Sequence, residues 1–545
     1  MGMVQRMIRA TAVLAAAVAA TAVPAVPALP EARRLPPAPG PAAAARPEGV
    51  ARPEGVARPE GVVWWECGDG LRCGKLSVPV DWARPRGPRT TVDVARMAAP
   101  DPARSLGTLV VNTGAGSTVQ GVRERPDTVS ELARWFDVVF MEPRGIGDRG
   151  SAAMVRCSVP QPDPRRLQVA PGQASWRSYA RDNAAYDRSC RIASGPAYEG
   201  LTSWQVAHDL DALRAALGEP RLRYFGNSYG AVYGQAYLEL FPRRVERMYL
   251  EGVPDHTQAG LGRRLIAHAR AAERQLAAFR DWCASRIDCP LDDDAVSVLD
   301  DLLDGRAPDG RALGGRLPDR RVSDGRVPDE RRIVAAVLAG LAPQRWPELA
   351  HALSAAEEGD TRALAALAAE SEPVAPAMVT RSSWCHDFMP AVPGYRRFLA
   401  MEARLRELAP RVGWLTGRYE IGRCLGLTAG PSWLPGRARP AAAGGDRGPA
   451  ARTERGSGGG PSVMVGIGRL DIDSPPSGAA RVAARVPGAV VLWHGDGHGA
   501  YLLQGARKLR ATCLRTRVHD FLVNGTPPPR TSCPAELTAD PGSSG

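Results

Sequence analysis

The sequence predicts an α/β fold in which a doubly wound, mostly parallel sheet is interrupted by an inserted helical region. Short apolar runs rich in β-branched and aromatic residues alternate with a helical pattern in the first half of the chain. Two more such runs follow only after a long helical stretch. Apolar runs that end in glycine or a polar turn and alternate with helices are typical of buried parallel strands joined by right-handed crossovers.

Six strands are predicted from these runs. They are GTLVVNTG from Gly107, FDVVFMEPRG from Phe136, LRYFGNS from Leu222, RMYLEGV from Arg247, SVMVGIG from Ser462 and AVVLWHG from Ala489. A helix is predicted before the third run, because apolar residues recur there at spacings of four, three and four: Val206, Leu210, Leu213 and Leu217. Thr202 or Ser203 is its expected N-cap, and Gly218 its expected end.

The long middle region is mostly helical in pattern. The segment RWPELAHALSAAEEGDTRALAALAAE predicts two helices that turn at Gly359 and Asp360. The predicted organisation is a signal peptide (1–28), an Ala/Pro-rich disordered spacer with three ARPEGV copies (29–63), the first part of the core (64–254), a helical cap (255–434), a flexible insertion (435–461), the second part of the core (462–535) and a tail (536–545).

The first residues have the composition of an export signal. Arg6 and Arg9 precede an apolar segment followed by small residues, and about 14 apolar residues are too few for a membrane anchor. The ten cysteines agree with export, because several are close neighbours: Cys67/Cys73, Cys157/Cys190, Cys283/Cys289, Cys385/Cys424 and Cys513/Cys533. Pairing in sequence order is the simplest arrangement, although spacing does not fix connectivity. We expect a secreted protein with disulfides.

Charge and motif content exclude several function classes. The net charge is +12, but the arginines are scattered among acids, which argues against nucleic-acid binding. The chain has no C-x-x-C motif and no Cys/His cluster of the kind that zinc requires, and we expect no metal or other cofactor.

The motif G-x-S-x-G at Gly226–Gly230 raises the possibility of a nucleophilic serine. The alternative is a small residue in a tight turn, but Ser228 stands between a predicted strand and the helix AVYGQAYLELF. A serine hydroxyl at this position projects above the sheet edge and needs an imidazole and a carboxylate to activate it. The two late strands end in GRLDIDSP and WHGDGHGAY, which supply an acid and a histidine in the order Ser, acid, His.

From Trp64 to Cys533 the sequence resembles the secreted tripeptidyl aminopeptidase-like α/β-hydrolases of actinomycetes, which are related to prolyl aminopeptidases. The matching motifs are CGKLSVPVDW, FDVVFMEPRGIG, the segment from VAHDLDALRAALG to RRVERMYLEGV, DIDSP, GDGHG and FLVNGTPPPRTSC. The resemblance implies an α/β-hydrolase fold with an inserted helical cap. It also implies Ser228 as nucleophile, Asp471 as acid and His498 as base.

Three neighbouring residues compete for the acid and base roles. Asp473 and Asp496 are the rival acids, and His494 is the other histidine of the last loop. The family's D-x-x-[TS]-P pattern falls on Asp471, and its Gly-His-Gly falls on His498. The rivals would then be a solvated loop acid, or a packed residue at a strand end.

Oxyanion and substrate contacts are less clearly marked. The family has a run like N-P-G-G-P-G-G-S-G where this chain has NTGAGSTVQG, and we assign the two donors to the N–H groups of Ala115 and Tyr229. For the α-ammonium of a substrate the first candidate is Asp387 and the second is Glu251. A purely structural role is the alternative for each.

The resulting hypothesis is a secreted serine exopeptidase that releases short peptides from free N-termini through an acyl-enzyme. Its partners would be peptides with a free N-terminus, without nucleic acid or a membrane span; the sequence does not indicate the oligomeric state. A secreted esterase or lactonase is the alternative enzyme. A binding protein with an impaired oxyanion turn is the non-enzymatic alternative.

Overall fold

A computed structural model describes residues 61–147, 154–256, 260–291, 294–304, 330–369, 382–387, 392–427, 462–529 and 531–538. They belong to one structural unit that starts at Arg58. The predicted signal peptide, almost all of the spacer, the insertion at 435–461 and the end of the tail lie outside the described residues.

The described part of the chain forms one sheet of ten strands in the order β1-β2-β3-β5-β4-β6-β7-β8-β9-β10. The strands are β1 (Val63–Glu66), β2 (Leu71–Pro79), β3 (Arg89–Met97), β4 (Thr108–Asn112), β5 (Asp137–Met141), β6 (Leu222–Asn227), β7 (Val245–Glu251), β8 (Ser462–Gly468), β9 (Val490–His494) and β10 (Ser532–Cys533). The pairs from β5 through β4 to β10 are parallel, and the pairs from β1 through β3 to β5 are antiparallel. All six predicted strands are confirmed, as is the mostly parallel α/β sheet.

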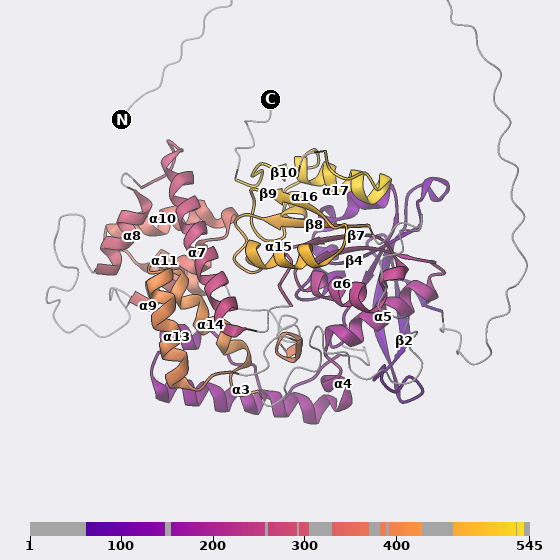
Figure 1. The fold of residues 1–545 in the computed structure, drawn as a ribbon, viewed down its shortest axis with the longest axis horizontal. Helices are drawn as coiled ribbons and strands as arrows, with labels where there is room; N and C mark the ends of the chain where they lie inside the picture. Colours follow the sequence, from indigo (N-terminus) through magenta and orange to yellow (C-terminus); the bar gives the residue numbers. More distant parts are fainter. Residues whose placement is uncertain are drawn as a thin grey trace, which may run out of the picture. The chain divides into compact units, whose positions relative to one another are not determined.

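Helices bury both faces of the sheet, as its continuous apolar strands require. In β4, Val110 points to one face while Leu109 and Val111 point to the other. The first face is covered by α5 (Ser203–Ala216), α6 (Tyr229–Leu240) and α15 (Pro476–Arg485), and the second by α16 (Ala500–Ala506) and α17 (Cys513–Asn524) (Figure 1). Helix α1 (Thr118–Glu124) adds Val122 to the second face. The core strands are therefore fixed from two sides, and their carboxyl ends are left for the site.

The helix predicted before β6 is α5. The Thr202 hydroxyl caps it by accepting from the Gln205 N–H, and Gly218 follows its end with a φ of 76°. Val206, Leu210 and Leu213 are buried against the sheet, as their spacing predicts.

The inserted helices are α7 (Leu261–Ala284), α8 (Ala295–Asp304), α9 (Glu330–Gly340), α10 (Trp346–Glu357), α11 (Arg362–Ala369), α13 (Tyr395–Leu408) and α14 (Thr416–Cys424). A short helical segment, 382–387, precedes α13. The predicted pair of helices is α10 and α11, with Gly359 between them at a φ of 96°. The cap thus interrupts the sheet between β7 and β8.

The predicted boundary between core and cap needs one correction. Helices α2 (Arg166–Val169), α3 (Gln173–Ser194) and α4 (Pro196–Glu199) come before β6, but α2 and α3 pack on the cap. The Tyr179 hydroxyl donates to the Gly422 carbonyl at 2.8 Å, and the Asn183 amide donates to the Leu425 carbonyl at 2.9 Å. Trp176 stacks on Phe398 of α13. The cap is therefore built from two separate segments of the chain.

The five expected disulfides are all present, and all ten cysteines lie in described residues: Cys67–Cys73, Cys157–Cys190, Cys283–Cys289, Cys385–Cys424 and Cys513–Cys533. The start of the predicted tail is packed against the core, because the Asp496 carboxylate accepts from the N–H groups of Glu536 and Leu537 at 2.9 Å each. Among the described residues, no helix has both the length and the apolar character that crossing a membrane requires.

Candidate active site

Ser228 lies in a sharp turn between β6 and α6. Its φ of 55° and ψ of −120° are unusual for a residue with a side chain, and such strain is found preferentially at functional sites. The turn is possible because Gly226 and Gly230 pack without side chains. A Cβ on Gly226 would lie 2.6 Å from the Gly230 carbonyl oxygen, and one on Gly230 would collide with the Asn112 backbone. The elbow therefore requires both glycines of the motif.

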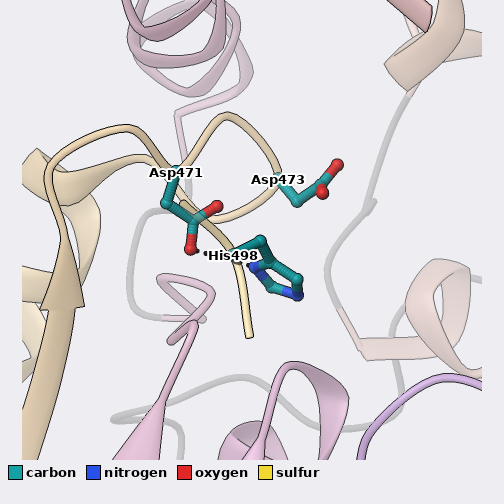
Figure 2. Close-up of side chains that lie close together, drawn as sticks. All are labelled: Asp471, Asp473 and His498. Atoms are coloured by element: carbon teal, nitrogen blue, oxygen red, sulfur yellow. Dashed lines mark hydrogen bonds and ion pairs between the residues drawn. The ribbon is translucent and has the colours of Figure 1, made fainter. Parts of the chain in front are cut away.

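Asp471 and His498 meet at the carboxyl edge of the sheet. Asp471 follows β8 and His498 follows β9, and the Asp471 Oδ2 lies 2.9 Å from the His498 Nδ1 (Figure 2). Ser474 orients the carboxylate, because its N–H and its hydroxyl both donate to Asp471, at 2.8 and 2.6 Å. This bond leaves the Nε2 of His498 available to a substrate or a nucleophile.

The imidazole lies on the same edge as Ser228. A Cβ on Gly252 would lie 2.7 Å from the His498 Cε1, so the ring rests on the backbone that follows β7. Glu251 precedes Gly252, and the Glu251 carbonyl accepts a hydrogen bond from the Ser228 N–H at 2.9 Å. Backbone contacts at the end of β7 thus place the serine and the histidine in one neighbourhood.

Burial and the paired charge set the protonation of this site. Burial alone lowers the pKa of His498, but the Asp471 carboxylate outweighs it and the pKa is raised to about 9. Burial raises the pKa of Asp471, yet His498 and Ser474 more than compensate, so that the pKa falls below its usual value. Asp471 is therefore ionised whenever the site is functional, and it stabilises the imidazolium.

The rival residues take other positions. Asp473 is exposed on the same loop, and its carboxylate points away from Asp471 (Figure 2). Asp496 accepts backbone N–H groups of the chain end, which is a structural role. His494 is fully buried 3.6 Å from Glu251, and burial lowers its pKa to about 4. The geometry thus favours Asp471 and His498 as the acid and base.

Asp471, Asp473 and His498 also have the ligand types of a metal site. One ligand atom from each lies within 4.8 Å of the others. Both oxygens of Asp471 already accept hydrogen bonds, from Ser474 and His498, and a cation would have to displace them. These residues fit an acid–base pair better than a metal centre.

The glycine turn after β4 packs directly on the nucleophile. Gly114 and Gly116 have φ values of 106° and 94°, and a Cβ on Gly114 would lie 2.7 Å from the Ser228 Cβ and 3.3 Å from the Tyr229 nitrogen. The Tyr229 N–H is in the first turn of α6, where backbone N–H groups lack helical partners. The glycine turn that contains Ala115 therefore packs next to both Ser228 and the Tyr229 nitrogen.

Two asparagines that no sequence motif singles out hold this turn. The Asn112 side chain accepts the Gly114 N–H at 3.0 Å, and the Asn227 amide donates to the Thr113 carbonyl at 3.1 Å. Asn227 is the second residue of the G-x-S-x-G motif, where the pattern allows any residue. The sequence therefore offered no signal for its role.

The two carboxylates expected to bind substrate are not available for it, which corrects that prediction. Asp387 is buried, and its oxygens accept from the N–H and hydroxyl of Ser203 and from the Tyr229 hydroxyl. Glu251 is fully buried and accepts the Tyr501 N–H at 3.1 Å. Burial raises the pKa of Asp387 to about 6 and that of Glu251 to about 7. Both side chains therefore hold the protein together beneath the site.

A pocket with about 340 Å³ of empty volume, open to solvent, lies beside the acid–base pair. The core contributes Asp473 and Ser474 from the Asp471 loop, and the cap contributes Arg264 and His268 from α7 and Trp384 from the segment 382–387. The cap is also bonded to this loop, because the His268 Nδ1 lies 2.9 Å from the Ile472 carbonyl. A substrate in this pocket would contact both cap and core.

Comparisons with known proteins agree with the fold. Residues 129–288 match the family model of the alpha/beta hydrolase fold, and residues 438–533 match the model described as TAP-like protein. The chain is 28% identical to the serine protease Hip1 of Mycobacterium tuberculosis, over 84% of this chain and 86% of that protein. It is 30% identical to the tripeptidyl aminopeptidase of Streptomyces coelicolor, over 41% of this chain and 42% of that protein. A third relative, carboxylesterase B of M. tuberculosis, is 26% identical over 84% of this chain and 85% of that protein.

These relatives are enzymes, and the non-enzymatic alternative is set aside. The sheet order, the elbow at β6 and the two family matches lead to one assignment. The chain is an enzyme with the α/β-hydrolase fold and a TAP-like C-terminal region, similar to serine proteases and tripeptidyl aminopeptidases of actinomycetes.

Proposed function

We propose that this protein is a secreted serine exopeptidase that releases short peptides from free N-termini, with Ser228, His498 and Asp471 as its catalytic residues. The single observation that supports this most is the Asp471–His498 pair at the strand ends next to the elbow of Ser228. The relatives named as a serine protease and a tripeptidyl aminopeptidase favour a peptide substrate.

The reaction proceeds through an acyl-enzyme. The His498 Nε2 takes the proton of the Ser228 hydroxyl as the oxygen attacks the scissile carbonyl. The N–H groups of Tyr229 and Ala115 donate to the oxyanion that forms. The imidazolium then gives its proton to the leaving amine, and the C–N bond breaks. In the second half, His498 takes a proton from a water molecule while the water oxygen attacks the ester carbonyl. The bond between the acyl carbon and the Ser228 oxygen then breaks, the imidazolium returns its proton to that oxygen, and the short peptide leaves.

An extracellular location belongs to the same proposal. The export signal predicted at the N-terminus and the five disulfides both fit an oxidising compartment. Recovery of the mature chain from culture medium, with its N-terminus mapped by sequencing, tests this part. Retention in the cytoplasm with reduced thiols would contradict it.

An esterase is the second candidate, favoured by the relative named carboxylesterase B. The fold and the triad serve both reactions, so substrates must decide between them. A panel of peptide amides with free and acetylated N-termini and of simple esters separates the two. We expect free peptides to be cleaved and acetylated ones to resist. Equal cleavage of acetylated peptides, or cleavage of esters alone, would favour the esterase.

The nucleophile has its own test. Ser228→Ala should lower turnover on the order of a million-fold, and so should His498→Ala, because the members of a triad act as a unit. Ser297→Ala, an exposed serine on α8, is the matched control and should retain wild-type activity and labelling by a fluorophosphonate. A Ser228→Ala variant that still reacts with the probe would show that another residue is the nucleophile.

A further inference from the structure

We propose that Asp473 is the carboxylate that receives the α-ammonium of the substrate, and that its position favours acyl groups of one or two residues. This inference rests on the proposed exopeptidase function. It moves amine recognition from Asp387 and Glu251 to the loop that also holds the catalytic acid.

The charges of the pocket beside His498 leave Asp473 as the acid available to a ligand. Asp255 is paired with Arg481 at 2.9 Å. Arg264, which is buried, has the negative charges of Glu420 and Asp255 near it. Within the described residues Asp473 has no hydrogen bond or salt bridge, and it is exposed. A ligand that brings a positive charge therefore completes the pocket.

Other charged groups act on Asp473 from a distance. The nearby cationic groups are His498 and Arg423, which both interact with its carboxylate. The Arg423 guanidinium lies over the rings of Trp384 and Tyr419, so its direction is set by the cap. Asp473 lines the pocket, where a substrate ammonium group can form a charge-assisted hydrogen bond with its carboxylate.

The distance between His498 and Asp473 sets the expected length of the acyl group. An oxygen of Asp473 lies within 4.8 Å of a ring nitrogen of His498. The base works within about 3 Å of the group whose proton it moves. An extended peptide advances about 3.3 Å per residue, so one or two residues fit between the scissile carbonyl and Asp473. Three residues span about 10 Å, which is the limit of this reach, so we expect the shorter acyl groups to be favoured.

The test compares Asp473→Asn with the wild type on alanyl-, dialanyl- and trialanyl-coumarylamide, with p-nitrophenyl butyrate as the reference. The quantity measured is the ratio of kcat/KM for the amide to kcat/KM for the ester. Asp473 also raises the pKa of His498, and because this ratio is taken at each pH, that effect cancels. We expect Asp473→Asn to lower the ratio about tenfold to a hundredfold, mainly through KM, for the one- and two-residue amides.

Two controls make the result specific. Asp301→Asn removes the same charge from an exposed position on α8 and should leave the ratio at its wild-type value. Asp473→Glu keeps the carboxylate and should restore most of the ratio. Thermal unfolding and the rate of fluorophosphonate labelling show that each variant is folded with a reactive serine.

The outcomes separate this inference from the proposed function. An unchanged ratio in Asp473→Asn, in an enzyme that cuts only free peptides, would overturn the role of Asp473 while the exopeptidase stands. A loss confined to the trialanyl amide would overturn the length. If the wild type cuts acetylated peptides as well as free ones, the exopeptidase itself fails.

Discussion

The Asp471→Asn substitution should change the pH dependence of the enzyme in a defined direction. In the wild type the pKa of His498 is raised to about 9 against a usual value of 6.5. Three carboxylates act on the ring: Asp471, Asp473 and Glu251. This difference corresponds to about 3 kcal/mol in favour of the imidazolium, and most of it comes from the bonded Asp471.

We expect kcat/KM to rise with pH, because His498 can act as a base only when it is neutral. Below pH 9 most of His498 carries a proton and cannot accept another from Ser228, so kcat/KM should rise about tenfold per pH unit from pH 7 to 8.5 and level off above 9. With a pKa of about 9, we expect only about 1% of the enzyme to be in the active form at pH 7. Protonation of Glu251, whose pKa is raised to about 7 by burial, should add curvature at the low end.

Removing the charge of Asp471 should have two effects on the pH profile. The rising part of the profile should move to lower pH, and the plateau value of kcat/KM should fall. Without Asp471 the burial of His498 dominates, and its pKa should fall below 6.5. The plateau should fall on the order of ten-thousandfold, because the amide does not hold the ring in the required tautomer. At pH 7 the loss should be only on the order of a hundredfold, since the variant is fully deprotonated there while the wild type is not.

The assay is kcat/KM for one peptide amide from pH 5.5 to 10, for both proteins, with stability checked at each pH. A substrate whose amine titrates adds its own limb near pH 8, which the ester reference lacks. Comparing the profiles of the two substrates therefore separates the titration of the enzyme from that of the substrate amine. A wild-type ester profile with its midpoint near 6.5, or a variant whose midpoint does not move, would refute the electrostatic reasoning.

Two further substitutions test the oxyanion turn and the cap. Gly114→Ala should lower kcat by about a hundredfold or more, because its Cβ would lie 2.7 Å from that of Ser228 and Gly114 has a φ of 106°. The control is Gly121→Ala, which has open space around it and should keep the wild-type kcat. Equal rates in the two variants would show that the turn does not shape the site. Replacing both Cys385 and Cys424 with serine should lower the free energy of unfolding by about 4 kcal/mol for a closed loop of this length, measured by urea denaturation. A change below 1 kcal/mol would mean that the bridge constrains little.

The sequence predicted the central sheet better than its edge. Strands β4 to β8 are largely buried, and continuous apolar runs such as SVMVGIG reveal them. Strand β2 alternates buried and partly exposed residues and includes Gly74, and its pairing with β3 depends on tertiary contacts. Helix α3 was also missed, because its buried face includes the polar groups of Tyr179 and Asn183, which bond to cap carbonyls.

The sequence likewise predicted some residues of the candidate site better than others. The order Ser, acid, His and the strand ends predicted Ser228, Asp471 and His498, because topology brings the carboxyl ends of parallel strands together. No local pattern could show that Asp387 would be buried, since its partner Ser203 lies 184 residues earlier. Burial is a property of packing, and it decides whether a carboxylate binds a ligand or a neighbouring donor.

The buried position of Asp387 connects the cap to the nucleophile elbow. Tyr229 offers its backbone N–H to the oxyanion, while its side-chain hydroxyl donates to Asp387 at 2.5 Å. Asp387 belongs to the segment 382–387, which Cys385 ties to α14 of the cap, and the same carboxylate accepts the Ser203 N–H at the start of α5. Since an unpaired buried carboxylate is costly, these donors must stay in place together. The residue expected to select the substrate thus fixes the helix that stabilises the transition state, and this leaves the choice of substrate to groups that solvent can reach.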